Sequence, residues 1–171
     1  MERNNQKVTF GGNPVTLLGD AARPGNIAPD FTVMDSDMKP VKLSDFNGKI
    51  KVLSVAPSID TPVCANQTRT FNKEATKMND NIAVLSISVD LPFALKRFCA
   101  AEGIDNVEAL SDHKDVDFGT KYGFLIEEMR LLARGIVVID KDNTIKYVEY
   151  VPEIGEEPNY QKALEEVRKL V

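Results

Sequence analysis

Cys64 is the residue of this sequence whose setting best suits it for chemistry. It ends the run Pro57-Ser58-Ile59-Asp60-Thr61-Pro62-Val63-Cys64. The thiolate is the nucleophilic form of cysteine, but a free thiol has a pKa of about 8.5, and only a few per cent of it is ionised at pH 7. A helix N-terminus and a nearby cation can lower such a pKa to roughly 3.5–7.5. Cys64 is therefore a candidate catalytic thiol if the chain places it at the start of a helix.

The residues before Cys64 predict a strand that stops and a helix that begins. Pro57 follows an apolar stretch and cannot donate to a strand ladder. Asp60 or Thr61 can act as the N-cap, and Pro62 suits the first helical position. With Thr61 as N-cap, Cys64 lies in the first turn, near unpaired N–H groups and the positive end of the helix dipole. The Thr61 hydroxyl can then bond either the Cys64 N–H or its sulfur. A free cysteine often serves as a small buried hydrophobe, but helix capping by itself does not require a cysteine here.

The elements that must position this site follow from the apolar patterns along the chain. Strands are expected at 7–10, 15–18, 31–34, 41–43, 51–56, 82–89, 135–140 and 144–150. Three of them are apolar at nearly every position, which is typical of strands buried on both faces. The last one alternates and follows a turn, so it should pair antiparallel with the strand before it. Helices are expected at about 62–78, after Asp90, at 115–122 and at 158–170. This order predicts one α/β domain over residues 1–171, with a thioredoxin-like mixed sheet flanked by helices and an added N-terminal β-hairpin.

Composition narrows the classes of function. The net charge is −5, and no run of Lys and Arg is long enough to favour nucleic acid. We expect no membrane span, because no segment approaches about 20 apolar residues. The polar start of the chain lacks the apolar stretch of a signal peptide, so we expect a cytoplasmic protein. Two cysteines are too few for a disulfide scaffold, and in a reducing compartment they are more often catalytic or redox-sensing.

The run around Cys64 resembles the active-site pattern of the peroxiredoxins, Pro-x-x-x-Thr/Ser-x-x-Cys. Pro57, Thr61 and Cys64 match this pattern position for position. The resemblance narrows to the thiol peroxidase subgroup, which are atypical two-cysteine peroxiredoxins. The segments similar to that subgroup are 8–15, 90–103 and 132–140.

The resemblance implies a role for each site residue. Cys64 would be the peroxidatic thiolate, which attacks the O–O bond of a peroxide and becomes a sulfenic acid. Thr61 would hold the sulfur and the peroxide oxygen, and Pro57 would shield the pocket. Arg134 would stabilise the thiolate and the charge on the leaving oxygen. Cys99 would be the resolving thiol that forms an intrachain disulfide with Cys64. The same resemblance implies recycling by thioredoxin, a homodimer, and no metal or organic cofactor.

The residues alone leave alternatives open for two of these roles. Cys99 follows Phe98 beside an apolar stripe, so core packing explains it as well as reactivity does. Arg134 opens a buried strand, where an arginine is usually only solvated, and Arg130 is a less favoured substitute nearby. If the two sulfurs start far apart, at least one helix end must loosen before they can bridge.

The chain offers little for other kinds of site. His113 is its only histidine and lies in the polar run 111–115, expected to be a surface loop, so a His-rich metal site is excluded. The leading interpretation is a thioredoxin-dependent peroxidase that reduces hydrogen peroxide and organic hydroperoxides. A thiol–disulfide oxidoreductase is the second interpretation, and the missing Cys-x-x-Cys argues against it. The third is a non-catalytic redox sensor that forms the Cys64–Cys99 bond.

Overall fold

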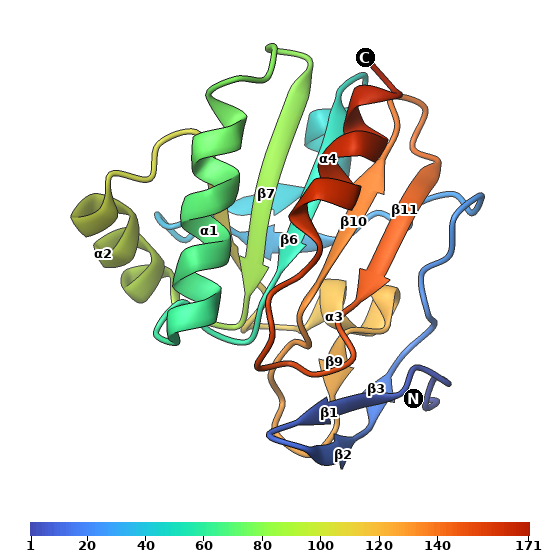
Figure 1. Cartoon of the computed structure of the whole chain (residues 1–171). Helices are drawn as coiled ribbons and strands as arrows, with labels where there is room; N and C mark the ends of the chain where they lie inside the picture. Colours follow the sequence, from blue (N-terminus) through green and yellow to red (C-terminus); the bar gives the residue numbers. More distant parts are fainter.

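The computed structural model describes all 171 residues and contains one large sheet, two small ones and helices around them (Figure 1). The strands are β1 Val8–Phe10, β2 Asn13–Val15, β3 Leu17–Leu18, β4 Thr32–Met34, β5 Pro40–Lys42, β6 Ile50–Val55, β7 Ile82–Ser88, β8 Glu108–Ser111, β9 Leu125–Ile126, β10 Gly135–Ile139 and β11 Ile145–Tyr150. The α-helices are α1 Pro62–Ala75, α2 Pro92–Glu102, α3 Asp117–Tyr122 and α4 Tyr160–Arg168, and a short 3-10 helix, η1, spans Leu43–Phe46.

The large sheet is mixed and has seven strands in the order β11-β10-β6-β7-β8-β4-β5. β6, β7 and β8 run parallel, whereas β10 is antiparallel to both β6 and β11. The expected pairing of the last two strands is therefore confirmed. The parallel strands carry long crossovers that contain α1 and α2, as parallel pairing requires.

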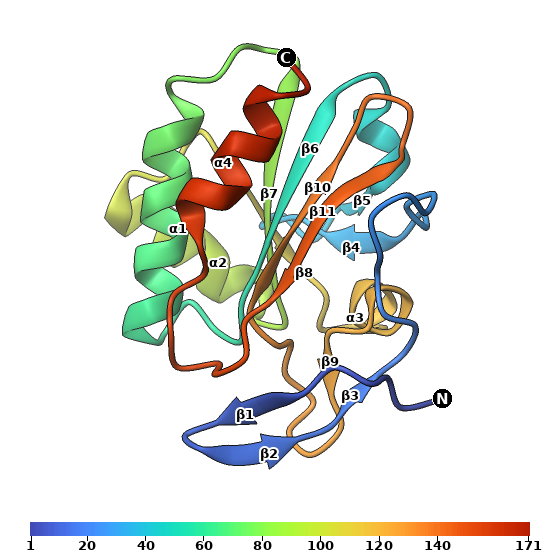
Figure 2. The same cartoon turned by 45° about the vertical axis from the view of Figure 1, so that its right-hand side comes forward.

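The central strands are apolar at nearly every position because each of their faces is covered by a different core. On β6, Val52 belongs to the core under α1 and α4, while its neighbour Leu53 belongs to the core on the opposite face. Figures 1 and 2 show α1 and α4 over one face of the sheet and α3 on the other. Successive side chains of a strand point to opposite faces, so both must be apolar when both faces are buried.

The register of β6 and β10 sets the position of the candidate site. Gly135 lies opposite Val55, so the first residue of one strand faces the last residue of the other. The chain therefore enters β10 at the end of the sheet where it leaves β6 for α1. This brings Arg134 to the same end as the loop that carries Cys64.

The N-terminal hairpin differs in detail from the expected one. Its turn is only Gly11 and Gly12, both with positive φ (59° and 82°), which fits a tight two-residue connection. Asn13 and Pro14 belong to β2, and the chain then leaves the hairpin, because β3 pairs with β9 instead. The hairpin lies beyond the end of the large sheet that carries Arg134 (Figures 1 and 2).

The polar run 111–115 was expected to be a surface loop, and that expectation is wrong for its first two residues. Ser111 ends β8, a strand that the sequence analysis missed, and Asp112 is 2% exposed. The Asp112 carboxylate accepts hydrogen bonds from Phe118 N–H and Gly119 N–H in α3, at 3.0 and 2.8 Å. Burial raises the pKa of Asp112 to about 6. Its polar side chain is buried because it satisfies backbone donors at a helix start.

None of the helices combines the length with the apolar character that crossing a bilayer requires.

Glu153 attaches the hairpin to the segment that follows β11. Its carboxylate accepts hydrogen bonds from the Thr9 hydroxyl and from the N–H groups of Gly11, Gly12 and Gly155. Consecutive N–H groups in a turn of this kind form a concave anion-binding site. These bonds, that from Gly155 first, lower the pKa of Glu153 to about 2.

Protonation of Glu153 should weaken its bonds to the hairpin only at a pH far below the ordinary pKa of a glutamate. Because the folded pKa is depressed, this stabilisation is complete above the unfolded value of about 4.3 and is lost as pH falls towards about 2. The amide signals of Gly11 and Gly12, followed by NMR, should stay constant down to about pH 4 and shift below it. A midpoint at the unperturbed glutamate value would contradict this prediction.

Candidate active site

Cys64 lies in the first turn of α1, as its sequence setting predicted. Thr61 is the N-cap with extended backbone, Pro62 is the first helical residue, and Cys64 is the third. The thiol is fully buried and is not part of a disulfide. The start of α1 therefore directs its unpaired backbone N–H groups and the positive end of its dipole towards the region of this sulfur.

Arg134 is the group that contacts the sulfur. Its Nη2 donates to Cys64 Sγ at 3.2 Å, its Nη1 donates to Gln67 Oε1 at 2.8 Å, and its Nε donates to the Ile154 carbonyl at 2.7 Å. The residue is only 2% exposed. All three guanidinium nitrogens thus donate a hydrogen bond, and the one from Nη2 goes to the thiol. Arg130, the alternative considered from sequence, is exposed.

No carboxylate compensates the charge of this guanidinium. The ion pairs of the molecule all involve other residues, and none includes Arg134. A guanidinium keeps its charge in proteins, and a buried charge is normally compensated by a partner of opposite sign. Among its three acceptors, only Cys64 can become an anion. The arrangement therefore places the one acceptor that can ionise directly beside the guanidinium.

Gln67 is a residue of this site that sequence reasoning missed. It lies one turn after Cys64 and is fully buried. While its Oε1 accepts from Arg134, its Nε2 donates to Ser54 Oγ at 2.8 Å and to the Val55 carbonyl at 3.2 Å. This neutral amide connects the guanidinium to the end of β6 without adding a competing negative charge. A polar amide three positions after the cysteine, on the same helix face, was the available signal.

Asp90 organises the loop between β6 and α1 and was also missed as part of the site. Its carboxylate accepts from the Ser58 hydroxyl at 2.7 Å, from Ile59 N–H at 2.8 Å and from the Ser88 hydroxyl at 2.7 Å. These bonds tie the loop before Cys64 to the end of the neighbouring strand, β7. Pro57 is buried at the start of the same loop.

The Thr61 hydroxyl has a different partner from the two that were expected. It donates to the Ser58 carbonyl at 2.9 Å and makes no capping bond to the helix. The residue is exposed. Because a hydroxyl oxygen can also accept, this bond leaves Thr61 able to receive a hydrogen bond from a molecule beside it.

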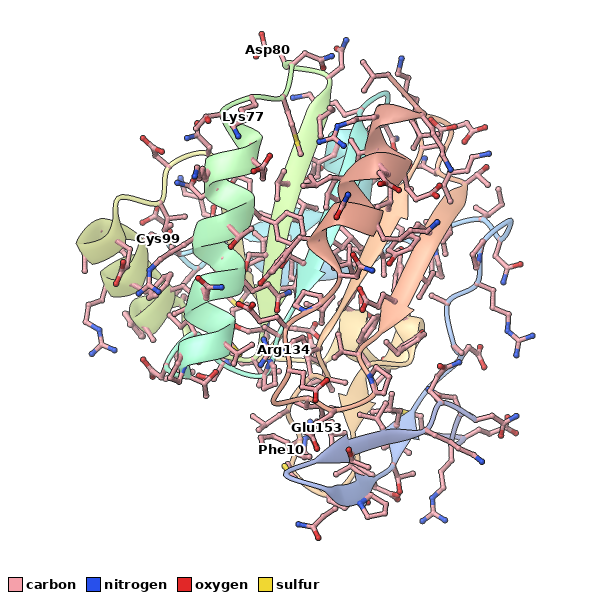
Figure 3. The ribbon with its side chains drawn as sticks, in the orientation of Figure 1. Phe10, Lys77, Asp80, Cys99, Arg134 and Glu153 are labelled. Carbon is pink, nitrogen blue, oxygen red and sulfur yellow. The ribbon has the colours of Figure 1, made fainter.

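Cys99 is not brought to Cys64 in this structure. It lies in the last turn of α2, half-buried, and packs at the edge of the core beneath α1 and α4. Figure 3 shows it on the opposite side of α1 from Arg134. Burial raises the pKa of the Cys99 thiol, so this thiol is held protonated where it lies.

The remaining ionisable groups form no second site of this kind. His113 is exposed, and no group of three or more His, Cys, Asp or Glu side chains is arranged to hold a metal ion. The site thus consists of one buried thiol, one guanidinium and the hydroxyl and amide groups around them. This arrangement suits nucleophilic attack by sulfur on an electrophile whose developing negative charge the guanidinium can stabilise.

Comparison with known proteins agrees with this chemistry. Residues 23–164 match the family model described as Redoxin. The chain is 54% identical to a thiol peroxidase from Oceanobacillus iheyensis, covering 95% of this chain and 98% of that protein. It is 50% identical to a thiol peroxidase from Bacillus subtilis, covering 96% and 98% of the two chains. A peroxiredoxin-like protein from Aquifex aeolicus, known from its crystal structure, is 38% identical to this chain in sequence. The two structures superpose over 100% of each chain with a TM-score of 0.92.

The structural match confirms the predicted thioredoxin-like α/β fold with its N-terminal hairpin. At 50–54% identity over nearly the whole length of these relatives, and with most of its residues inside the Redoxin match, the chain belongs to the Redoxin family and, within it, to the thiol peroxidases.

Proposed function

We propose that this chain reduces hydrogen peroxide and organic hydroperoxides through a Cys64 sulfenic acid, that Cys99 resolves this acid, and that thioredoxin recycles the enzyme. The observation that carries the proposal is the 3.2 Å contact between Arg134 Nη2 and the buried Cys64 sulfur. Sulfur without a nearby cation would be mostly a thiol at neutral pH and a slow nucleophile.

In the first step the Cys64 thiolate attacks one oxygen of the peroxide. A sulfur–oxygen bond forms, the O–O bond breaks, and the departing oxygen takes up a proton to leave as water or an alcohol. Arg134 stabilises the charge on that oxygen. The Thr61 oxygen accepts a hydrogen bond from the peroxide while its own hydroxyl proton is donated to the Ser58 carbonyl. Pro57 shields the pocket so that the sulfenic acid is protected from solvent.

In the second step the Cys99 thiol condenses with the sulfenic acid, which gives a disulfide and one molecule of water. Reduced thioredoxin then donates two electrons through thiol–disulfide exchange and restores both thiols. No metal or organic cofactor enters this cycle.

A coupled assay with thioredoxin and its reductase tests the cycle. The wild type should consume many equivalents of peroxide. Cys64→Ser should fall to background, because the nucleophile is gone. Cys99→Ser should react with the first peroxide and then fail to be recycled. Full turnover by Cys64→Ser would refute the assignment, and wild-type consumption that stops after about one equivalent would indicate a sensor instead.

The second step requires movement, because a disulfide needs its two Cα atoms within about 4.4–6.8 Å. Arg69 and Glu102 hold the end of α2 against α1 through two bonds of 2.8 and 2.9 Å. We expect at least one helix end to loosen in the disulfide form, so that its amides exchange with solvent faster than in the reduced form. Identical amide protection in the two forms would contradict this expectation.

Loss of the Arg69–Glu102 pair should speed resolution. Glu102→Gln should raise the rate of disulfide formation after one equivalent of peroxide about two- to fivefold, the size expected of an exposed ion pair. Quenched-flow mass spectrometry measures this rate. Glu74→Gln is the matched control, because Glu74 pairs with Lys77 beside it rather than with α2.

We also propose that two copies of the chain form a homodimer near the active-site end. Leu91 and Phe93, at the start of α2, are 53% and 68% exposed and support an apolar contact there. Sedimentation equilibrium should give twice the mass of one chain, whereas a single-chain mass at high concentration would refute the dimer.

A further inference from the structure

The segment after β11 holds both the side chain and the backbone of Arg134. The Ile154 carbonyl accepts from Arg134 Nε at 2.7 Å, and the Arg134 carbonyl accepts from Val151 N–H at 2.9 Å. Because a guanidinium is planar and rigid, fixing Nε also sets the direction of both Nη groups. The position of the Ile154 carbonyl therefore helps to determine how Nη2 approaches the sulfur of Cys64.

The segment that contains Ile154 is held in turn by the N-terminal hairpin. Thr9 N–H donates to the Pro152 carbonyl at 2.8 Å, and Ile154 N–H donates to the Thr9 carbonyl at 2.9 Å. Figure 3 shows Glu153 between Arg134 and Phe10 of the hairpin. The same peptide segment is thus bonded to the hairpin on one side and to Arg134 on the other.

Glu153 provides the side-chain link between these parts. Its Oε1 accepts from the Thr9 hydroxyl at 2.9 Å and from Gly12 N–H at 2.8 Å. Its Oε2 accepts from Gly11 N–H at 3.2 Å and from Gly155 N–H at 2.8 Å. All four donors are uncharged, and they belong to the hairpin and to the residues beside Ile154.

We propose that Glu153 is a positioning residue for Arg134: by fixing the Ile154 carbonyl against the hairpin, it directs the guanidinium at the Cys64 sulfur. The hairpin precedes the Redoxin match, which begins at residue 23. The N-terminal hairpin, which lies outside the Redoxin match, would therefore contribute to the geometry of the active site. It rests on the proposed role of Arg134 in activating Cys64.

The direction in which loss of the Glu153 carboxylate changes the formation of the Cys64 thiolate separates a positioning role from a simple electrostatic effect. Glu153 forms no ion pair with Arg134. If its carboxylate acted only as a nearby negative charge, removing that charge would make the thiolate easier to form. If it positions Arg134, removing it makes the thiolate harder to form, because the guanidinium is less well directed.

The test measures the rate at which Cys64 is alkylated by iodoacetamide as a function of pH. A Cys99→Ser background leaves Cys64 as the only thiol. In Glu153→Gln the midpoint of this profile should move up by about one pH unit, so that alkylation below the midpoint slows about tenfold. An unchanged midpoint, or a lower one, would overturn the proposal.

Glu128→Gln is the matched control. The Glu128 carboxylate also binds the chain next to the hairpin: it accepts hydrogen bonds from Thr16 N–H at 2.8 Å and from the Thr16 hydroxyl at 3.0 Å, directly after β2. It has no hydrogen bond to the segment that contains Ile154. Its profile should match the wild type. An equal shift in both variants would mean that general loosening of the hairpin, and not Glu153, moves Arg134.

Arg134→Lys separates failure of this inference from failure of the proposed function. It should shift the profile at least as far as Glu153→Gln, and the double variant should shift no further than Arg134→Lys alone. If Arg134→Lys has no effect, the proposed role of the arginine fails. If Arg134→Lys shifts the profile but Glu153→Gln does not, only the present inference fails.

The hairpin should survive the substitution, because Val8 is buried and Phe10 and Val15 pack on the core. If Glu153→Gln nevertheless fails to fold, the alkylation profile of Thr9→Val tests the proposal instead. It removes one of the four bonds to Glu153 and should give a smaller shift in the same direction, and no shift would overturn the proposal.

Discussion

The candidate site is organised around Arg134, a buried guanidinium that forms no ion pair with a carboxylate. Leaving such a charge uncompensated costs on the order of several kcal/mol, and a carboxylate beside it would remove the cost and also the chemistry. Arg134 instead contacts a carbonyl, an amide oxygen and the sulfur of Cys64. Of these three acceptors, only the sulfur can carry a negative charge.

The contacts of that guanidinium come from two segments that lie far apart in the sequence. The sulfur lies at the start of α1, the amide of Gln67 one turn later, and the Ile154 carbonyl beyond β11. The antiparallel register of β6 and β10 brings these parts to one end of the sheet. Because the two strands are buried on both faces, a slip of one residue would move every side chain into the opposite core, which is packed around other side chains.

The two cysteines have opposite settings, and this difference suits their proposed roles. Cys64 lies beside a cation at a helix start, while Cys99 is in the last turn of α2, where burial raises its pKa. A resolving thiol that is protonated and packed away does not compete for peroxide. The exposed pair between Arg69 and Glu102 joins α2 to α1, and exposed ion pairs of this kind are weak.

Local sequence patterns were enough to predict the end of β6, the start of α1 and the position of the thiol in its first turn, because proline, capping residues and apolar periodicity act over a few neighbouring residues. The sequence predicted that Thr61 and Pro62 begin α1 and that Cys64 lies in its first turn, and the structure agrees. It could not decide between a solvated Arg134 and a buried one, and it did not find Gln67 or Asp90 as site residues. Those assignments depend on strand register and on contacts between segments distant in sequence. Only the tertiary structure fixes these, because a polar side chain is buried only where its partners meet it.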